Sequence, residues 1–126
     1  MVLAIAATQS VSAASVPRHV SMFALIASPA AFDGQLVVVI GFAHFEFEGD
    51  TLCPHEQDHR ARISQNCLWL DASAASKASR IAVHNKYAIV EGRFDATDHG
   101  HMGMFSGAIR DVSRLELWSR EGSSPE

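Results

Sequence analysis

Residues 25–48 read LIASPAAFDGQLVVVIGFAHFEFE, and this stretch decides the fold. An apolar run at helical spacing covers 20–27, and Pro29 cannot continue that helix because its ring clashes with the preceding turn. An Asp-Gly turn dipeptide follows, and β-branched residues that favour strand over helix come directly after it. We therefore expect a short helix that ends before Pro29 and one long strand over 36–48.

Four later segments have strand character, and together with the first they predict a small barrel. The last of them changes its alternation near Asp111, as a β-bulge would cause. Pro54 opens one or two helical turns, whereas residues 71–79 are a small-residue loop that we expect to be mobile. The strands predicted after the first span 51–53, 67–71, 86–94 and 105–118.

These elements indicate a mainly β fold with minor α content, a five-stranded, OB-like Greek-key barrel. The expected helices are a short one at the N-terminus and a short one between strands two and three. An OB-fold has its standard helix between strands three and four instead, where this sequence has the small-residue loop. A small sandwich or another half-open barrel is the alternative fold.

The chain has 126 residues, of which 48% are hydrophobic, and this suits one domain over 16–118. Residues 1–15 resemble the end of a secretory signal but lack its positively charged start, so a disordered leader is the other interpretation. Residues 119–126 are expected to be a disordered tail. We therefore expect an exported, periplasmic protein, with a cytoplasmic location as the alternative.

The charge pattern argues against two classes of partner. The formal net charge is −4 and the 10 Lys and Arg residues are scattered, so the basic patch that a phosphate backbone requires is missing. No segment approaches the roughly 20 apolar residues of a membrane-spanning helix. We expect neither nucleic-acid binding nor a membrane-embedded protein.

Cys53 and Cys67 are the two cysteines, and their spacing is too wide for a Cys-x-x-Cys redox or zinc motif. Cys53 ends one predicted strand and Cys67 begins the next, so a disulfide becomes possible if these segments pair, and export would favour it. Two small buried hydrophobic side chains are the equally weighted alternative.

Three separated blocks carry a resemblance to a family of small, functionally uncharacterised bacterial proteins. They read LIASPAAFDGQLVVVIGFAHFEFEGD, NCLWLD and KYAIVEGRFDATDHGHMGMFSGAIRDVSR, within residues 20–114. The resemblance implies an OB-like barrel and supplies no activity. The chain departs from the family at Cys53-Pro54-His55, where the family has Tyr-Leu-His, so the family does not predict the local conformation there.

The Gly- and His-rich loop 98–107 is the preferred candidate site, because the connection between strands four and five borders the ligand face of an OB barrel. In a functional interpretation His99 and His101 stand at its mouth, while Met102 and Met104 offer adaptable apolar surface to a protein or small ligand. In a structural interpretation the glycines permit a tight turn that packs these methionines under the barrel.

The most specific form of this hypothesis is a binding site for Zn²⁺ or a similar divalent ion. His99 and His101 lie two residues apart, and His44 shares a strand face with Glu46, so these side chains could converge if the loop folds over strand one. The spacing alone does not require it, so the sequence predicts no cofactor and keeps the metal as an alternative.

Two further patterns are weaker. Tyr87, Trp69 and Trp118 could stack on a ligand at a barrel face, although three aromatic residues in a small core are equally expected as packing. His55 and His59 stand four residues apart on a predicted helix and could hold an ion between them, but a solvated helix face is the commoner meaning of that spacing.

The sequence therefore predicts a non-enzymatic binding module whose loop between strands four and five contacts a protein or small ligand. No nucleophile motif accompanies the scattered carboxylates, so no catalytic residue is assigned. The alternatives are a metal-binding protein that uses His99 and His101, and an immunity-type inhibitor of a toxin or hydrolase.

Overall fold

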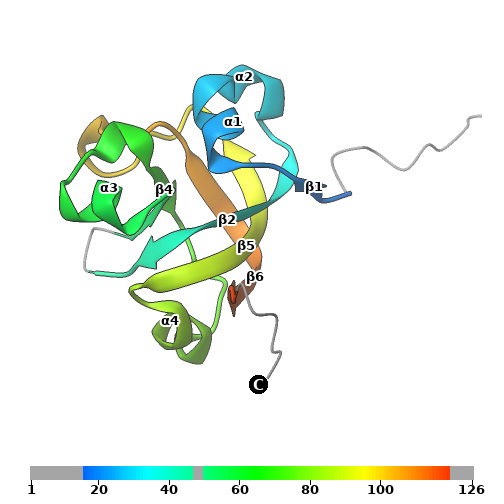
Figure 1. The fold of residues 1–126 in the computed structure, drawn as a ribbon. Coiled ribbons are helices and arrows are strands. Elements are labelled where there is room, and N and C mark those ends of the chain that lie inside the picture. Colours follow the sequence, from blue (N-terminus) through cyan, green and yellow to red (C-terminus); the bar gives the residue numbers. More distant parts are fainter. Residues whose placement is uncertain (1–15, 47–49, 120–126) are drawn as a thin grey trace, which may run out of the picture.

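The computed structural model describes residues 16–46 and 50–119, and the six strands within these ranges form one sheet that closes on itself (Figure 1). The strands are β1 (Arg18–His19), β2 (Leu36–His44), β3 (Thr51–Cys53), β4 (Leu68–Leu70), β5 (Lys86–Asp95) and β6 (Ala108–Leu117). The helices are α1 (Met22–Ala27), α2 (Pro29–Phe32), α3 (Glu56–Arg60) and α4 (Lys77–Val83), with 3-10 turns η2 (Ser64–Asn66) and η3 (His101–Gly103).

The strand order around the barrel is β2, β3, β4, β6 and β5, and β5 pairs with β2 to close it. The β4–β6 pair is parallel, whereas the other barrel pairs are antiparallel. β1 adds a short parallel pair on the side of β2, outside the closed barrel. This is the Greek-key arrangement of a small OB-like barrel, so the predicted fold is confirmed.

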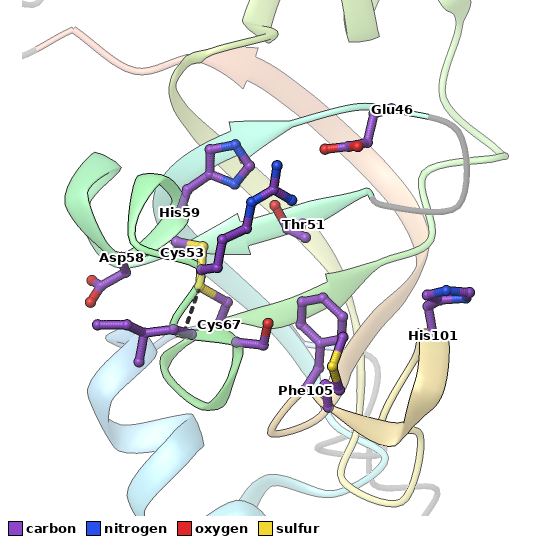
Figure 2. Close-up of a pocket in the computed structure, with 12 residues that line it drawn as sticks. Glu46, Thr51, Cys53, Asp58, His59, Cys67, His101 and Phe105 are labelled. Carbon is purple, nitrogen blue, oxygen red and sulfur yellow. Dashed lines mark hydrogen bonds between the residues drawn. A yellow bond between two sulfur atoms is a disulfide. The ribbon is translucent and has the colours of Figure 1, made fainter.

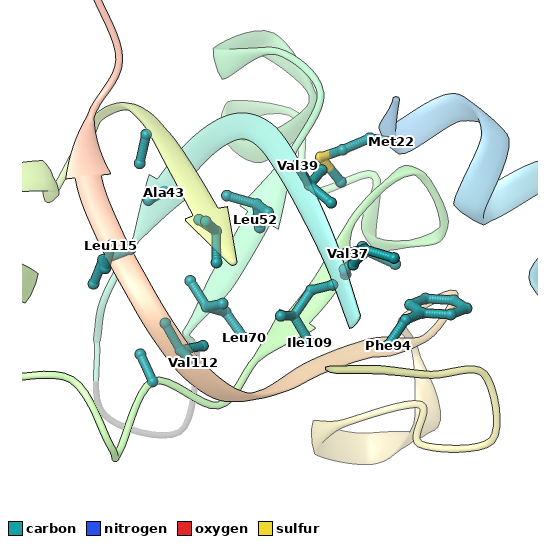
Figure 3. Close-up of a cluster of buried hydrophobic side chains, with 14 of the residues drawn as sticks. Met22, Val37, Val39, Ala43, Leu52, Leu70, Phe94, Ile109, Val112 and Leu115 are labelled. Atoms are coloured by element: carbon teal, nitrogen blue, oxygen red, sulfur yellow. The ribbon is translucent and has the colours of Figure 1, made fainter. Parts of the chain in front are cut away.

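Alternation along β3 and β4 sorts their side chains between the barrel interior and its outer surface. Leu52, Leu68 and Leu70 are fully buried and belong to the main core, some of whose side chains are drawn in Figure 3. Thr51 is directly opposite His44 on β2 and opposite Trp69 on β4. Since residues opposite each other in a ladder share a face, His44, Thr51 and Trp69 form one row on the outer surface.

A disulfide fastens the segment 54–66 over this outer surface. Cys53 ends β3 and Cys67 precedes β4, and their sulfurs are bonded at 2.09 Å. α3 and η2 lie within the loop that this bond closes. Both cysteines are buried with Phe105 in a second apolar cluster, against which Trp69 packs. Of the two interpretations of the cysteines, the structure therefore has the disulfide.

Helix α4 occupies the end of the segment that the sequence predicts as a mobile loop, and that prediction is wrong from Lys77 onward. Ser76 caps the helix by accepting a hydrogen bond from the Ser79 amide at 3.0 Å, and Val83 is fully buried. The small residues here have no clear apolar period, so the cap and tertiary contacts decide the structure. α4 lies between the third and fourth barrel strands, the usual position of the OB helix.

The strand bounds differ from the predicted ones at β6, which begins at Ala108 because η3 and a turn occupy the residues before it. The predicted irregularity near Asp111 is confirmed, since Asp111 has a φ of 51° and the β5–β6 register shifts between Glu91 and Arg93. β2 is a strand as far as His44, and residues 47–49 lie outside the described ranges.

Two predictions concern the ends of the chain. The predicted leader 1–15 and nearly all of the predicted tail lie outside the described residues, so the export prediction stays a prediction. A disulfide is the state that an oxidising compartment maintains. Within the described residues, every helix is too short or too polar to cross a bilayer.

We expect replacement of both cysteines, Cys53→Ala with Cys67→Ala, to lower the free energy of unfolding by about 3 kcal/mol, because the bond closes a loop of roughly 15 residues in the unfolded chain. Urea unfolding of the oxidised protein and the double variant measures the difference. Equal stabilities would mean that the segment 54–66 is held by its other contacts alone.

Candidate functional site

A pocket of about 250 Å³ lies on the outer surface of β3 and is named here the β3 pocket (Figure 2). Its wall comes from the end of β2, from β3, from the segment that the disulfide closes and from the loop between β5 and β6. This is the ligand face of an OB barrel, whose second and third strands are β3 and β4 in this chain. The lining residues are Glu46, Thr51, Cys53, Asp58, His59, Arg62, Ile63, Ser64, Cys67, His101, Met104 and Phe105.

Two walls of the pocket are bonded to each other. Ser106 donates its amide hydrogen to the carbonyl of Cys67 at 3.1 Å, and its hydroxyl donates to the carbonyl of Gln65. The floor is apolar, because the disulfide and Phe105 meet there and Trp69 contacts Phe105 edge-on at 5.4 Å between ring centroids. The pocket is therefore built from two loops fixed to the barrel and to each other.

Thr51 places an unpaired polar atom in this apolar setting. Thr51 is only 7% exposed, and its Oγ1 has no hydrogen-bond partner among the described residues. Figure 2 shows Thr51 between Glu46 and His59 on one side and Phe105 on the other. Since buried polar atoms are almost always hydrogen-bonded, this hydroxyl is the atom of the pocket that most needs a partner.

The charged groups of the pocket are unequally engaged. Asp58 accepts a hydrogen bond from the Asn66 side chain at 2.9 Å, and Glu46 pairs with His44 at 2.7 Å. Arg62 has no side-chain hydrogen bond or ion pair with any residue that the structure describes. The guanidinium is therefore the unengaged charge of the lining, and guanidinium groups bind carboxylates well.

Histidines gather at the rim beside Glu46. The ring centroids of His44 and His59 are 4.1 Å apart, and His44 Nδ1 lies 2.6 Å from Asn85 Oδ1. One ligand atom from each of His44, Glu46 and His59 lies within 4.8 Å of the others. Partial burial lowers the pKa of His59 below its usual 6.5, and the neighbouring His44 and Arg62 lower it further, which favours the neutral ring.

The loop 98–107 is closed by its own hydrogen bonds. His99 Nδ1 donates to the carbonyl of Phe105 at 2.8 Å, and the Phe105 amide donates back to the carbonyl of His99 at 3.0 Å. His101 stacks over Trp69 with an interplanar angle of 24°. His99 therefore shapes the loop without lining the β3 pocket, whereas His101 lines it.

The predicted binding residues do not form one surface. His101 and Met104 line the pocket, but Met102 is 77% exposed and lies outside the lining. Tyr87 and Trp118 are joined at the other end of the β5–β6 hairpin, where the Trp118 amide donates to the carbonyl of Tyr87. The hairpin separates them from the loop 98–107 because that loop connects the opposite ends of the same two strands.

The predicted histidine pairings differ from the observed ones. His44 lies with Glu46 and His59, and the described cluster of metal-ligating side chains contains neither His99 nor His101. His55 is the N-cap of α3 and its ring contacts Phe23, so it does not share a helix face with His59.

Sequence reasoning missed Thr51 and Arg62. Alternation in the segment 51–53 places Thr51 and Cys53 on the same face, but it does not reveal that loops bury that face. Arg62 has a φ of 59°, a conformation that non-glycine residues seldom adopt, and nothing in the local sequence predicts it. The sequence spacing suggests His55, four residues away, as the partner of His59 and gives no sign of its contact with His44.

No protein-family model matches the chain, and neither a curated protein nor a solved structure matches it. The resemblance to small bacterial proteins stays a prediction. The site must therefore be interpreted from its own geometry.

Gly100 and Gly103 offer a matched pair of variants for the packing of the loop. Both have positive φ, +66° and +67°, so alanine is strained at each. A Cβ at Gly100 would lie 2.7 Å from three atoms of Trp69, whereas at Gly103 nothing lies within 4 Å. We expect Gly103→Ala to cost about 1 kcal/mol in unfolding free energy and Gly100→Ala about 2–3 kcal/mol more, since the loop must move off the indole.

Urea unfolding measures both losses, and the indole N–H resonance of Trp69 reports the local change. That resonance should shift in Gly100→Ala and stay in place in Gly103→Ala. Unchanged indole resonances in both variants would show that the loop does not pack on Trp69.

Asp95 fixes the base of the same loop. Its carboxylate accepts hydrogen bonds from the hydroxyl and amide of Thr97 and pairs with Arg110 at 2.7 Å, and these contacts hold the pKa of Asp95 below its usual 3.8. A depressed folded pKa means that the carboxylate stabilises the fold above the unfolded pKa, and that this contribution is lost as the pH falls through the folded pKa.

We therefore expect Asp95→Asn to unfold at a lower urea concentration than the unchanged protein at about pH 7, and the difference to close near pH 2. The effect at neutral pH should be modest, because the pair with Arg110 is accessible to solvent. A difference of the same size at both pH values would contradict the role of the charge.

Proposed function

We propose that this chain is a binding module whose β3 pocket takes a small ligand with an apolar body and one acidic group. The observation that carries the proposal is the buried Thr51 hydroxyl, which has no hydrogen-bond partner among the described residues. Leaving such a hydroxyl unpaired costs roughly 1–3 kcal/mol. A ligand that hydrogen-bonds to it would recover that cost on binding.

The size and floor of the pocket support a small, partly apolar ligand. A volume of about 250 Å³ lies just below the usual range for pockets that hold drug-sized molecules. Phe105, Met104 and the disulfide supply the apolar contact surface, and Met104 can adapt its side chain to different shapes. An aromatic ring or a short branched chain suits such a floor.

Arg62 supports the acidic group. Both carboxylates of the lining are engaged, Glu46 with His44 and Asp58 with Asn66, whereas the guanidinium has no partner in the described structure. A ligand carboxylate would give Arg62 a charge-assisted partner, which is about twice as strong as a neutral hydrogen bond. The lining therefore supports an acidic ligand more than a neutral or basic one.

The remaining functional hypotheses have less support. A protein partner on the exposed Met102 would use a surface outside the pocket, and the inhibitor of a toxin or hydrolase rests on fold class alone. Both stay predictions.

Benzoate and benzyl alcohol are suitable probes, because they share a ring and differ in charge. In ¹H–¹⁵N spectra we expect benzoate to shift the amides of Thr51, Arg62 and Phe105 with a Kd of about 1 mM, and benzyl alcohol to bind more weakly. Arg62→Gln should weaken benzoate about tenfold and leave benzyl alcohol unchanged, since one charge-assisted bond is worth at least about 1.4 kcal/mol.

The matched control is Arg60→Gln, because Arg60 stands on the same segment but pairs with Glu56 and does not line the pocket. Thr51→Val provides a second test: it should leave the free protein equally or more stable, because it removes an unpaired buried hydroxyl, and it should weaken both probes. Shifts confined to residues away from the pocket, or no shift with millimolar probe, would overturn the proposal.

A further inference from the structure

We propose that His44, Glu46 and His59 form a binding site for a divalent transition-metal ion of the Zn²⁺ class. One ligand atom from each side chain lies within 4.8 Å of the others. Two imidazoles and one carboxylate are a donor set that suits Zn²⁺ and leaves a coordination position open. This inference does not depend on the proposed small ligand, since the pocket can bind such a ligand without a metal.

Two separate parts of the chain bring the ligands together. His44 is the last residue of β2, and Glu46 follows two residues later, so both leave the chain on the same side. His59 comes from α3, which the Cys53–Cys67 bond holds against the end of β3. The site therefore depends on the disulfide-closed segment, which holds His59 beside His44 and Glu46.

Asn85 orients the first ligand. Its Oδ1 lies 2.6 Å from His44 Nδ1, and its backbone N–H donates to the carbonyl of Ala43 at 2.8 Å. When Nδ1–H donates to Asn85, Nε2 is the ring nitrogen left for a metal ion. Nε2 faces Glu46 at 2.7 Å, and an ion bound there takes the place of the proton that this contact requires. Metal-ligating histidines almost always have such a partner on the other ring nitrogen, and it fixes their tautomer.

The spacing requires only small shifts. Donor atoms around tetrahedral Zn²⁺ lie about 3.3 Å apart, given bonds of about 2.0–2.1 Å. The observed 2.7 Å between His44 and Glu46 is shorter, so an ion must move these two side chains apart, whereas the ligand atom of His59 is already within 4.8 Å of both. Glu46 lies beyond the end of β2 and is exposed, so it can make this adjustment.

One neighbouring group opposes a cation. Arg62 lies close enough to His59 to act on its charge, and it lines the same pocket. We therefore expect a Kd of about 1–10 µM and not the tighter values of fully enclosed structural zinc sites. Glu46 and His59 both line the β3 pocket, whereas His44 and His59 line a neighbouring hollow with Asn85, so the cluster lies between the two.

The test uses the folded, oxidised chain without a histidine tag. Calorimetric titration with Zn²⁺ should show one ion per chain, and Co²⁺ bound in its place should give the visible absorption of a four-coordinate site. His59→Asn and Glu46→Gln should each weaken Zn²⁺ at least tenfold, and Asn85→Ala roughly tenfold, as expected for a partner that orients a ligand. His101→Asn is the matched control, because it changes a histidine of the same pocket outside the ligand set.

The proposal is overturned if Zn²⁺ does not saturate the chain at about 100 µM, or if His59→Asn keeps full affinity while His101→Asn loses it. Glu46 is exposed, so Glu46→Gln should keep the fold, and its circular dichroism verifies this before titration. Benzoate binding is measured in the presence of a chelator, so failure of the metal site and failure of the small-ligand proposal give separate results.

Discussion

The pairing of β2 on both of its edges is the constraint on which the rest of the structure depends. β2 pairs with β5 from Leu36 to Ala43, and its C-terminal end also pairs with β3. Because β2 is hydrogen-bonded to a neighbouring strand on each edge, the sheet closes into a barrel. The alternation of side chains along β2 then fixes which of its residues enter the core. Val37, Val39 and Ala43 point inward in this register, so His44 must point out, toward the surface where the candidate site lies.

The outer surface of β3 becomes a pocket because two loops cover it. A bare OB barrel exposes this face, but here the disulfide holds the segment 54–66 across it and Ser106 bonds the second loop to that segment. Covering the strand buries Thr51 without giving its hydroxyl a partner among the described residues. Natural proteins tolerate such a cost chiefly at functional sites, where local stability is exchanged for binding.

The barrel could be predicted from the sequence because its signals are local. The β-branched run after the Asp-Gly turn and the phase change near Asp111 each report the backbone of their own segment. The site could not be predicted in the same way, since His59 reaches His44 only through α3, the disulfide and the closed sheet. Helix α4 was missed for a related reason, because Ser76 and Val83 stabilise it through a cap and a tertiary contact, and its apolar period is weak.

Some residues of the site stand on paired strands and others stand beyond them, so their positions are fixed to different degrees. This difference decides which of them can move when a ligand binds. His44 and Thr51 are opposite each other in the β2–β3 ladder, so their relative position is fixed by backbone hydrogen bonds. Glu46 has left the strand and is held through its amide, which donates to the Asp50 carboxylate at 3.0 Å. Functional groups on strands are placed more accurately than groups on loops. The row of His44 and Thr51 therefore sets the geometry, and Glu46 is the group that can adapt to whichever ligand occupies the rim.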